Sequence, residues 1–369
     1  MLIGVNNAAN IKKMLLFSIP MTICNLRCHY CYLSQRDEFT TGIQPIMSYT
    51  PEQVGYALRP ERLGGYAYCN FCADGETMLV KDIDQYIRAL VVQGHYAEII
   101  SNMTISSVLD RFLSWGPELL AQIEFKCSFH YLELKKRGLL ELFAANVNRA
   151  WAAGASINLE FVPTDELIPY IDEMKEFSLS HFGALPHLTI ARDDRTEEIG
   201  YLTKLTMEEY DQVWSQFNSS FWEFKKSIFG IRENRFCYAG KWSCYINLTN
   251  GNTLPCYFGN SMGNVFEDPD SVFPEMPVGK CELAHCYNGH VYMTFGIVPG
   301  ATTVGYGDIR DRLRTDGTHW LQPELKAFFN TKLNKANKQL SIHERANIYN
   351  GYYAEYLTEI WHKLKRNGV

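Results

Sequence analysis

The sequence predicts an α/β protein built around one parallel sheet. Short apolar runs of strand length recur between Met14 and Arg192, and segments with apolar residues at helical spacing separate them. Helix-capping signals stand between several of these segments. Because parallel strands need crossover helices, six strands that alternate with six helices favour a single parallel sheet.

The first predicted strand, Met14–Pro20, leads directly into a cysteine-rich loop. Cys24, Cys28 and Cys31 follow with the spacing Cys-x3-Cys-x2-Cys, and the aromatic Tyr30 precedes the last cysteine. Three thiolates on one loop hold three corners of an iron–sulfur cube, which normally takes four cysteines. The fourth iron then stays open, and an open metal position is typical of a catalytic site rather than a structural one.

The spacing and the position of Tyr30 resemble the radical S-adenosylmethionine (radical SAM) superfamily. The resemblance implies a SAM-binding [4Fe–4S] cluster on these cysteines and a 5′-deoxyadenosyl radical that abstracts hydrogen from a substrate. It also implies that the sheet curls into a partial (β/α)6 TIM-like barrel. A zinc site is an alternative, because Cys69 and Cys72 form another Cys-x2-Cys pair, and core packing is a second. The zinc alternative leaves Cys24 without a role.

The later elements follow in order along the chain. A helix begins at Thr50-Pro51-Glu52-Gln53, which supplies an N-cap, a proline at the first helical position and a glutamine at N3. The remaining strands are predicted at Gly65–Phe71, Ala97–Ser101, Gln122–Phe129, Ala155–Val162 and Pro186–Arg192. The helices between them carry apolar faces at Ile83, Ile87, Leu90 and Val91, at Ile105, Val108, Leu109 and Phe112, and at Leu139, Phe143, Val147 and Trp151. A further helix is expected from about Asp165 to Phe177, and Thr206 with Glu209 forms a capping box for the last one.

Ligands of such sheets bind at the carboxyl ends of the strands, and polar residues stand there in this sequence. The segment after the second strand, Cys72-Ala73-Asp74-Gly75-Glu76-Thr77, resembles the Gly-Gly-Glu-Pro segment that binds the SAM amino group in the superfamily. Asp74 and Thr77 depart from that pattern, whereas Gly75 and Glu76 keep it. After the third strand, Ser101-Asn102 occupies the position where a Thr-Asn-Gly or Ser-Asn-Gly turn is common.

The fourth, fifth and sixth strands add further candidates. Period-two alternation places Lys126, Ser128 and His130 on one face of strand four. By position, Ser128 and Glu160 resemble SAM ribose contacts and Arg192 resembles a partner of the methionine carboxylate. Salt bridges at the barrel rim are the alternative for Glu160 and Arg192. We expect His130 to be a catalytic residue, with a structural histidine as the alternative.

A second group of cysteines lies beyond the predicted barrel. Its sequence, with Cys237, Gly251, Pro255-Cys256 and Gly263-Asn264-Val265, resembles the SPASM/Twitch extension of radical SAM enzymes. The resemblance implies an auxiliary [4Fe–4S] cluster, for which we select Cys237, Cys256, Cys281 and Cys286 as ligands and leave Cys244 as the spare. The turn Thr249-Asn250-Gly251-Asn252 predicts a hairpin on its own. A zinc ribbon with four cysteines is the alternative.

These patterns divide the chain into three parts. Residues 10–230 form the predicted barrel, 231–300 the auxiliary-cluster extension, and 301–369 a helical segment packed on the barrel. The last segment places its apolar residues at helical spacing: Tyr353, Leu357, Ile360, Trp361 and Leu364. The roles of Cys69, Cys72 and Cys127 stay open between hydrogen donors to a substrate radical and ordinary core packing, and the role of Cys244 is open as well.

Composition restricts the setting and the partners. The chain has 369 residues, of which 46% are hydrophobic, and it contains no apolar run of about 18 residues that would span a membrane. Eleven cysteines without a signal peptide indicate thiolates kept for metal in a reducing cytoplasm. A net charge of −6 with scattered lysines and arginines argues against nucleic-acid binding.

The expected activity is that of a radical SAM oxidoreductase or isomerase. We expect the substrate to be a small polar metabolite such as a sugar, aminocyclitol or nucleotide-linked sugar, with a flavodoxin- or ferredoxin-type electron donor. The auxiliary cluster would take part in electron transfer. The alternative is a maturase that cross-links or epimerises a ribosomally made peptide. Such maturases often carry an N-terminal leader-recognition domain, and little sequence precedes Met14.

Overall fold

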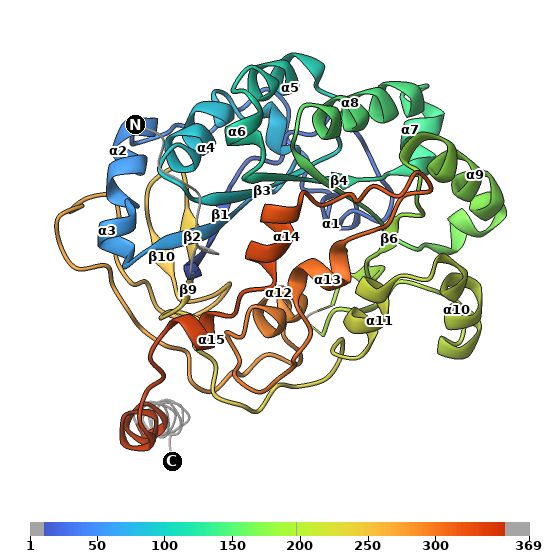
Figure 1. The fold of residues 1–369 in the computed structure, drawn as a ribbon. Helices are drawn as coiled ribbons and strands as arrows, with labels where there is room; N and C mark the ends of the chain where they lie inside the picture. Colours follow the sequence, from blue (N-terminus) through green and yellow to red (C-terminus); the bar gives the residue numbers. More distant parts are fainter. Residues whose placement is uncertain (1–10, 197, 351–369) are drawn as a thin grey trace.

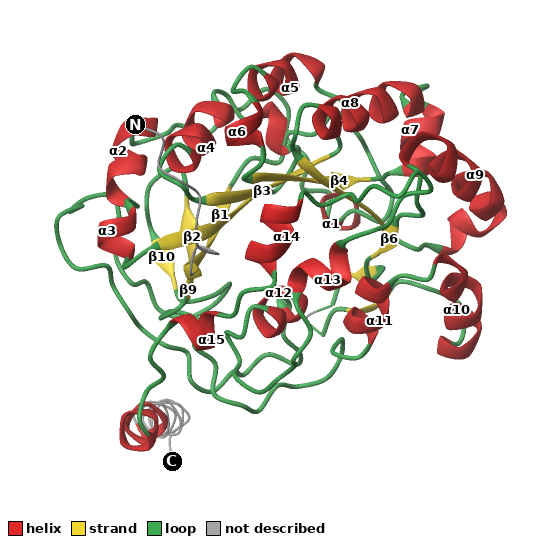
Figure 2. Ribbon diagram, in the orientation of Figure 1, coloured by secondary structure: helices red, strands yellow, loops and turns green. Residues whose placement is uncertain are grey.

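The computed structural model describes residues 11–196 and 198–350, and Figures 1 and 2 show its ribbon. Within these residues one sheet has eight strands in the order β10-β9-β1-β2-β3-β4-β5-β6. Its strands are β1 (Ile11–Ile19), β2 (Tyr66–Ala73), β3 (Tyr96–Ser101), β4 (Ile123–Ser128), β5 (Ser156–Phe161), β6 (His187–Leu188), β9 (Ser243–Asn247) and β10 (Thr253–Leu254). Strands β1 to β6 are all parallel and neighbour one another in chain order. The predicted α/β class is therefore confirmed, and the sheet is open, with β10 at one edge and β6 at the other.

Helices from the first half of the chain cover one face of the sheet (Figure 1). They are α2 (Pro51–Ala57), α3 (Pro60–Leu63), α4 (Ile83–Val91), α5 (Ser106–Leu113), α6 (Pro117–Leu120), α7 (Tyr131–Lys136), α8 (Leu140–Ala152) and α9 (Ile171–Phe182). The chain also contains short elements: α1 (Tyr32–Gln35) and the 3₁₀ turns η1 (Thr77–Leu79), η2 (Asp165–Tyr170) and η3 (Ser215–Phe217). Both predicted capping boxes are confirmed, at Thr50 before α2 and at Thr206 before α10 (Met207–Trp214).

The other face is covered by the later part of the chain (Figure 2). Its helices are α11 (Ser220–Lys226), α12 (Gly289–Thr294), α13 (Tyr306–Arg310), α14 (Pro323–Phe329) and α15 (Leu333–Ala336). Alternation along β1 explains how two cores arise, because successive side chains of a strand point to opposite faces. Leu15 and Phe17 pack in the larger core with the outer helices, whereas Met14 and Leu16 pack with the later helices.

The predicted hairpin is confirmed and it belongs to the same sheet. Strands β9 and β10 pair antiparallel, with Gly251 in the turn at a φ of 78°. On its other side β9 pairs parallel with β1, from Met14 opposite Ser243 to Ser18 opposite Asn247. The cysteine-rich extension is thus attached to the strand that leads into the first cysteine loop.

Two predicted elements differ from the structure. The sixth strand was expected over Pro186–Arg192, but β6 covers only His187–Leu188. Arg192 lies instead in a separate two-stranded ribbon of β7 (Arg192–Asp193) and β8 (Gly200–Tyr201). The helix expected from Asp165 begins as the 3₁₀ turn η2, which contains Pro169, and continues as α9. Proline lacks the amide hydrogen that a regular helix needs at that position.

The apolar helical face predicted from Tyr353 to Leu364 lies outside the described residues. Among the residues that are described, no helix is both long and apolar enough to cross a bilayer.

Candidate active site

The first cysteine loop lies at the carboxyl end of β1. Cys24, Cys28 and Cys31 line one small cavity of about 80 Å³ together with residues that follow β2, β3 and β4. The loop is fixed by a backbone bond in which the Cys31 amide donates to the Cys28 carbonyl at 3.1 Å. Asn25 anchors the loop to the end of β3, since its side chain donates to Thr104 Oγ1 at 2.7 Å. The structure therefore brings the three motif cysteines to the strand ends.

The segment after β2 runs directly beside this loop. The amides of Gly75 and Glu76 donate to the carbonyls of Met21 and Ile23 at 2.7 and 2.9 Å. A Cβ atom on Gly75 would lie 2.1 Å from the Ile23 carbonyl oxygen. Only glycine permits this approach, because any side chain would collide with the backbone of the cysteine loop.

Glu76 binds two other predicted residues, Ser101 and Asn102. Its buried carboxylate accepts from Ser101 Oγ at 2.7 Å, from the Asn102 amide at 2.8 Å and from the Met78 amide at 2.9 Å. Burial raises the pKa of Glu76, and these three donors oppose that shift. The Asn102 side chain in turn donates to Asn25 Oδ1 at 2.8 Å, so the network continues into the cysteine loop.

Tyr30 and His130 form a pair between two cavities. The Tyr30 hydroxyl lies 2.6 Å from His130 Nδ1. Burial lowers the pKa of His130 to about 4, so the imidazole is neutral at pH 7 and shares a hydrogen bond with the tyrosine hydroxyl through Nδ1. His130 and Ser128 border both the small cavity and a larger one next to it.

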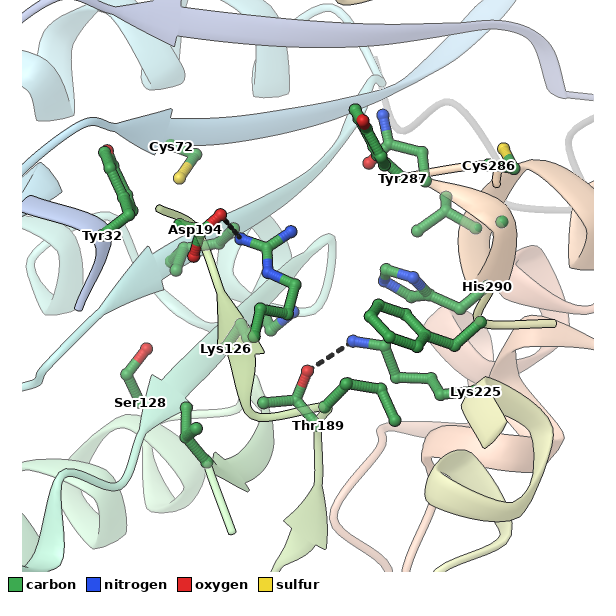
Figure 3. A pocket seen from close by; sticks show the side chains of 18 of the residues that line it. Tyr32, Cys72, Lys126, Ser128, Thr189, Asp194, Lys225, Cys286, Tyr287 and His290 are labelled. Atoms are coloured by element: carbon green, nitrogen blue, oxygen red, sulfur yellow. Dashed lines mark hydrogen bonds and ion pairs between the residues drawn. The ribbon is translucent and has the colours of Figure 1, made fainter. Parts of the chain in front are cut away.

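The larger cavity has a volume of about 380 Å³ and extends from the first cysteine loop to the second cysteine group. Cys31 and Cys72 belong to its barrel wall, and Cys286 to the opposite wall. Figure 3 shows Cys72 and Lys126 on one side and Cys286 and His290 on the other. Ligand sites of small molecules commonly fall in this range of volume.

The second cysteine group also converges. A narrow cavity is lined by all four selected cysteines: Cys237, Cys256, Cys281 and Cys286. Cys244 does not line it. That residue lies on β9 in the larger core on the outer face of the sheet, near Cys69.

The thiols of both groups are desolvated. Burial raises the pKa of Cys24 and of Cys256 to about 11 each, and it raises the pKa of Cys28 still further. Thiols with such raised pKa values are protonated at neutral pH unless a positively charged group binds them. An activated nucleophilic cysteine differs, because its pKa is lowered. Among the described residues, no three histidine, cysteine or carboxylate side chains converge on one point as ligands of a single ion. In an iron–sulfur cluster each thiolate binds a different iron, so its sulfurs need no common point.

No family model and no curated protein matches this sequence. Solved structures do match, and radical SAM enzymes are among them. The chain is similar to SuiB of Streptococcus suis, with 16% identity, coverage of 69% of this chain and 64% of that one, and a TM-score of 0.44. It is also similar to anSMEcpe with bound AdoMet (15% identity, 69% of this chain, 75% of that chain, TM-score 0.49). A third similar structure is BtrN in complex with AdoMet and 2-DOIA (15% identity, 70% of this chain, 82% of that chain, TM-score 0.36). The chain spans less than two thirds of the length of SuiB.

Of two predicted SAM contacts, Glu160 and Arg192, only Arg192 lines a cavity. Glu160 lines neither cavity, because its carboxylate is buried between Lys126 at 3.1 Å and Arg310 at 2.7 Å. This arrangement is the salt bridge that was the alternative for Glu160. Arg192 does line the larger cavity, and its guanidinium lies 3.9 Å from Asp194.

Sequence reasoning missed the charged cluster inside the barrel. Arg310, which is fully buried, lies 3.5 Å from Glu98, 2.9 Å from Glu124 and 2.7 Å from Glu160. The glutamates had a detectable signal, because each is a charged residue within an apolar strand, where an unpaired charge is costly. Arg310 comes from a short helix more than 100 positions later in the sequence, and no local pattern points to it.

Proposed function

We propose that this protein is a radical SAM enzyme that abstracts hydrogen from a small polar metabolite of the sugar, aminocyclitol or nucleotide-sugar type. One observation carries the proposal: the three motif cysteines line the same cavity as Gly75, Glu76, Ser101 and Asn102. That cavity borders a larger one that reaches the second cysteine group.

The residues fit the groups that the motifs imply. Cys24, Cys28 and Cys31 would hold a [4Fe–4S] cluster with one open iron, and thiolates are the donors that such clusters take. With SAM bound, this cluster supplies a 5′-deoxyadenosyl radical when it receives an electron, which we assign to a flavodoxin- or ferredoxin-type donor. The second group of cysteines would hold an auxiliary [4Fe–4S] cluster that takes part in electron transfer.

The chain's own residues would bind and orient these groups. Arg192 has only a loose contact with Asp194, so its guanidinium is free to pair with the methionine carboxylate of SAM. Ser128 borders both cavities, which is the position of a ribose contact. The pair of Tyr30 and neutral His130 would fix the ring orientations beside the cysteine loop. Buried residues around the cysteine loop, among them Cys28 and Glu76, would help to exclude water from a reactive radical.

The size of the larger cavity supports a small substrate. Its volume of about 380 Å³ is in the range of small-molecule sites. A peptide substrate would place one residue in this cavity and lead the rest of its chain out. Maturation of a peptide is therefore the alternative outcome of the substrate search.

The test is the production of 5′-deoxyadenosine from SAM by anaerobically reconstituted protein with dithionite. We expect the wild type to produce it, and a variant with Cys24, Cys28 and Cys31 changed to alanine to produce none. Cys69→Ala is the matched control, because this buried cysteine lines neither cavity. Production by the triple variant at the wild-type rate would refute the proposal.

A further inference from the structure

Three cationic side chains line the larger cavity: Lys126, Arg192 and Lys225. Two of them have carboxylate partners. Lys126 lies 3.1 Å from Glu160, and Arg192 lies 3.9 Å from Asp194. The third cation, Lys225, is not paired in this way.

Lys225 of α11 has no carboxylate within 4.0 Å among the described residues. Its ammonium donates to the hydroxyl of Thr189 and lies 4.9 Å from the centre of the Phe221 ring (Figure 3). A cation removed from bulk water without a counter-ion is costly, because neither a hydroxyl nor an aromatic ring neutralises its charge.

The carboxylates deeper in the barrel are already balanced. Although burial opposes ionisation, Arg310 and Lys126 hold the pKa values of Glu98 and Glu160 below their usual range. Burial raises the pKa of Glu124 to about 8, so this third carboxyl is protonated at pH 7. The ion pairs of these carboxylates are formed with Arg310 and Lys126, and none is formed with Lys225.

His290 of α12 lies on the same wall of the cavity. Its imidazole ring makes a T-shaped contact with the Phe221 ring, and no hydrogen bond of its ring nitrogens to another described residue is present. Figure 3 shows the His290 ring next to Lys225, with both side chains directed into the cavity. Burial lowers the pKa of His290, and the nearby Lys225 lowers it further. A neutral imidazole still offers one N–H donor.

Several charged or titratable groups face Lys225 from the elements around it. They are Lys126 on β4, Glu160 on β5, Arg192 on β7, Arg310 on α13 and His290 on α12. Burial, opposed by Glu160 and assisted by the three other cations, lowers the pKa of Lys225 to about 7. An anion bound beside the amine would favour its charged form.

Resting on the proposed function, we propose that Lys225 and His290 form an anion subsite that binds a carboxylate or phosphate group of the substrate, in the cavity between the two cysteine groups. An ammonium and an imidazole N–H give two donors to one oxygen-rich group, and hydrogen bonds to charged groups are the stronger kind. The substrate is accordingly a sugar acid, a sugar phosphate or another small metabolite with an anionic end. The Arg192 guanidinium stays available for the carboxylate of SAM.

The experiment measures anion binding to the unreduced, reconstituted protein with SAM present, by isothermal titration calorimetry. Inorganic phosphate and acetate are the two probes, and the one that binds more tightly identifies the kind of anionic group. We expect saturable binding of one anion per chain. Lys225→Met should weaken it by about tenfold or more, because a charge-assisted hydrogen bond is lost. Lys225→Arg keeps the charge and should restore binding to within about threefold of the wild type, which a folding defect at this position would not allow.

Lys226→Met is the matched control. This neighbouring lysine of α11 pairs with Asp211 and with Glu223 and does not line the cavity, so its loss should leave anion binding unchanged. Absence of saturable binding in the wild type, or equal binding in Lys225→Met and the wild type, would overturn the anion subsite. Production of 5′-deoxyadenosine, measured on the same preparations, separates the two proposals. If it is absent while anion binding persists, the radical SAM function fails and the subsite stands.

Discussion

The close approach of Gly75 to the cysteine loop gives a quantitative prediction. In a Gly75→Ala variant the new Cβ would lie 2.1 Å from the Ile23 carbonyl oxygen and 2.6 Å from its carbonyl carbon. An unstrained contact between carbon and oxygen needs about 3.3 Å, so one of the two backbones must move by about 1 Å. Ile23 precedes Cys24 directly, and the shift therefore reaches the first of the three motif cysteines.

A displacement of this size is expected to impair catalysis more than folding. Overpacking typically costs about 1–3 kcal/mol of unfolding free energy, which a chain of this size tolerates. Misplacement of reacting groups by about 1 Å can lower a rate about 100-fold. We therefore expect Gly75→Ala to fold, and to form 5′-deoxyadenosine from SAM about 100-fold more slowly than the wild type.

The assay follows 5′-deoxyadenosine formation under dithionite, with iron content and circular dichroism measured on the same samples. Gly200→Ala is the matched control, because a Cβ at Gly200 meets no atom within 4 Å. A Gly75→Ala rate within about threefold of the wild type, at equal iron content, would refute the argument that this glycine positions the cysteine loop.

Three further predictions concern the second cysteine group and the core. Changing Cys237 and Cys256 to alanine should lower the iron content from about eight to about four per chain, whereas Cys244→Ala should leave it at about eight. Equal iron content in the double variant and in Cys244→Ala would contradict the selected ligands. Arg310→Met should lower the free energy of unfolding by about 3–5 kcal/mol in urea titrations, because it leaves buried carboxylates unpaired, and a loss below about 1 kcal/mol would argue against this. Burial lowers the pKa of His95 from 6.5 to about 4 in the folded protein. As the pH drops from 6.5 to 4, the unfolded chain therefore takes up a proton at this histidine before the folded protein does, and the free energy of unfolding falls. His95→Gln should remove about 3 kcal/mol of that decline between pH 6.5 and 4, and parallel pH profiles of variant and wild type would contradict it.

The fold was largely predictable because local patterns determine it. Alternating apolar runs and helix caps fix the order of β1 to β5, and the Thr249–Asn252 turn fixes the hairpin. The length of strand β6 was overestimated. An apolar run indicates that a segment is buried, but it does not show how many of its residues pair with a neighbouring strand. The pairing of β9 with β1 was not predicted, because it joins segments more than 200 residues apart.

The candidate site was predictable where spacing carries the information. Cysteine spacing gave both groups, and the Gly75-Glu76 pair marked the segment beside them. The roles of residues whose partners lie far away in the sequence were harder to predict. Glu160 has the position expected of a ligand contact, yet Arg310 reaches it from the far end of the chain. No sequence motif marks Lys225. Its proposed role rests on its surroundings in the structure, where no carboxylate among the described residues lies near its ammonium group.

The parallel pairing of β1 with β9 sets the spatial relation between the two cysteine groups. One backbone ladder of five residue pairs, from Met14 with Ser243 to Ser18 with Asn247, joins β1, the strand before Cys24, to β9, the first strand of the hairpin that leads to Cys256. Any slip along this ladder moves one group past the other by about 3.3 Å per residue, and a slip by one residue also exchanges the two faces of β9. The register of the hairpin against β1 is therefore held by main-chain hydrogen bonds, which side-chain substitutions leave in place, whereas a single-residue insertion within β9 alters it.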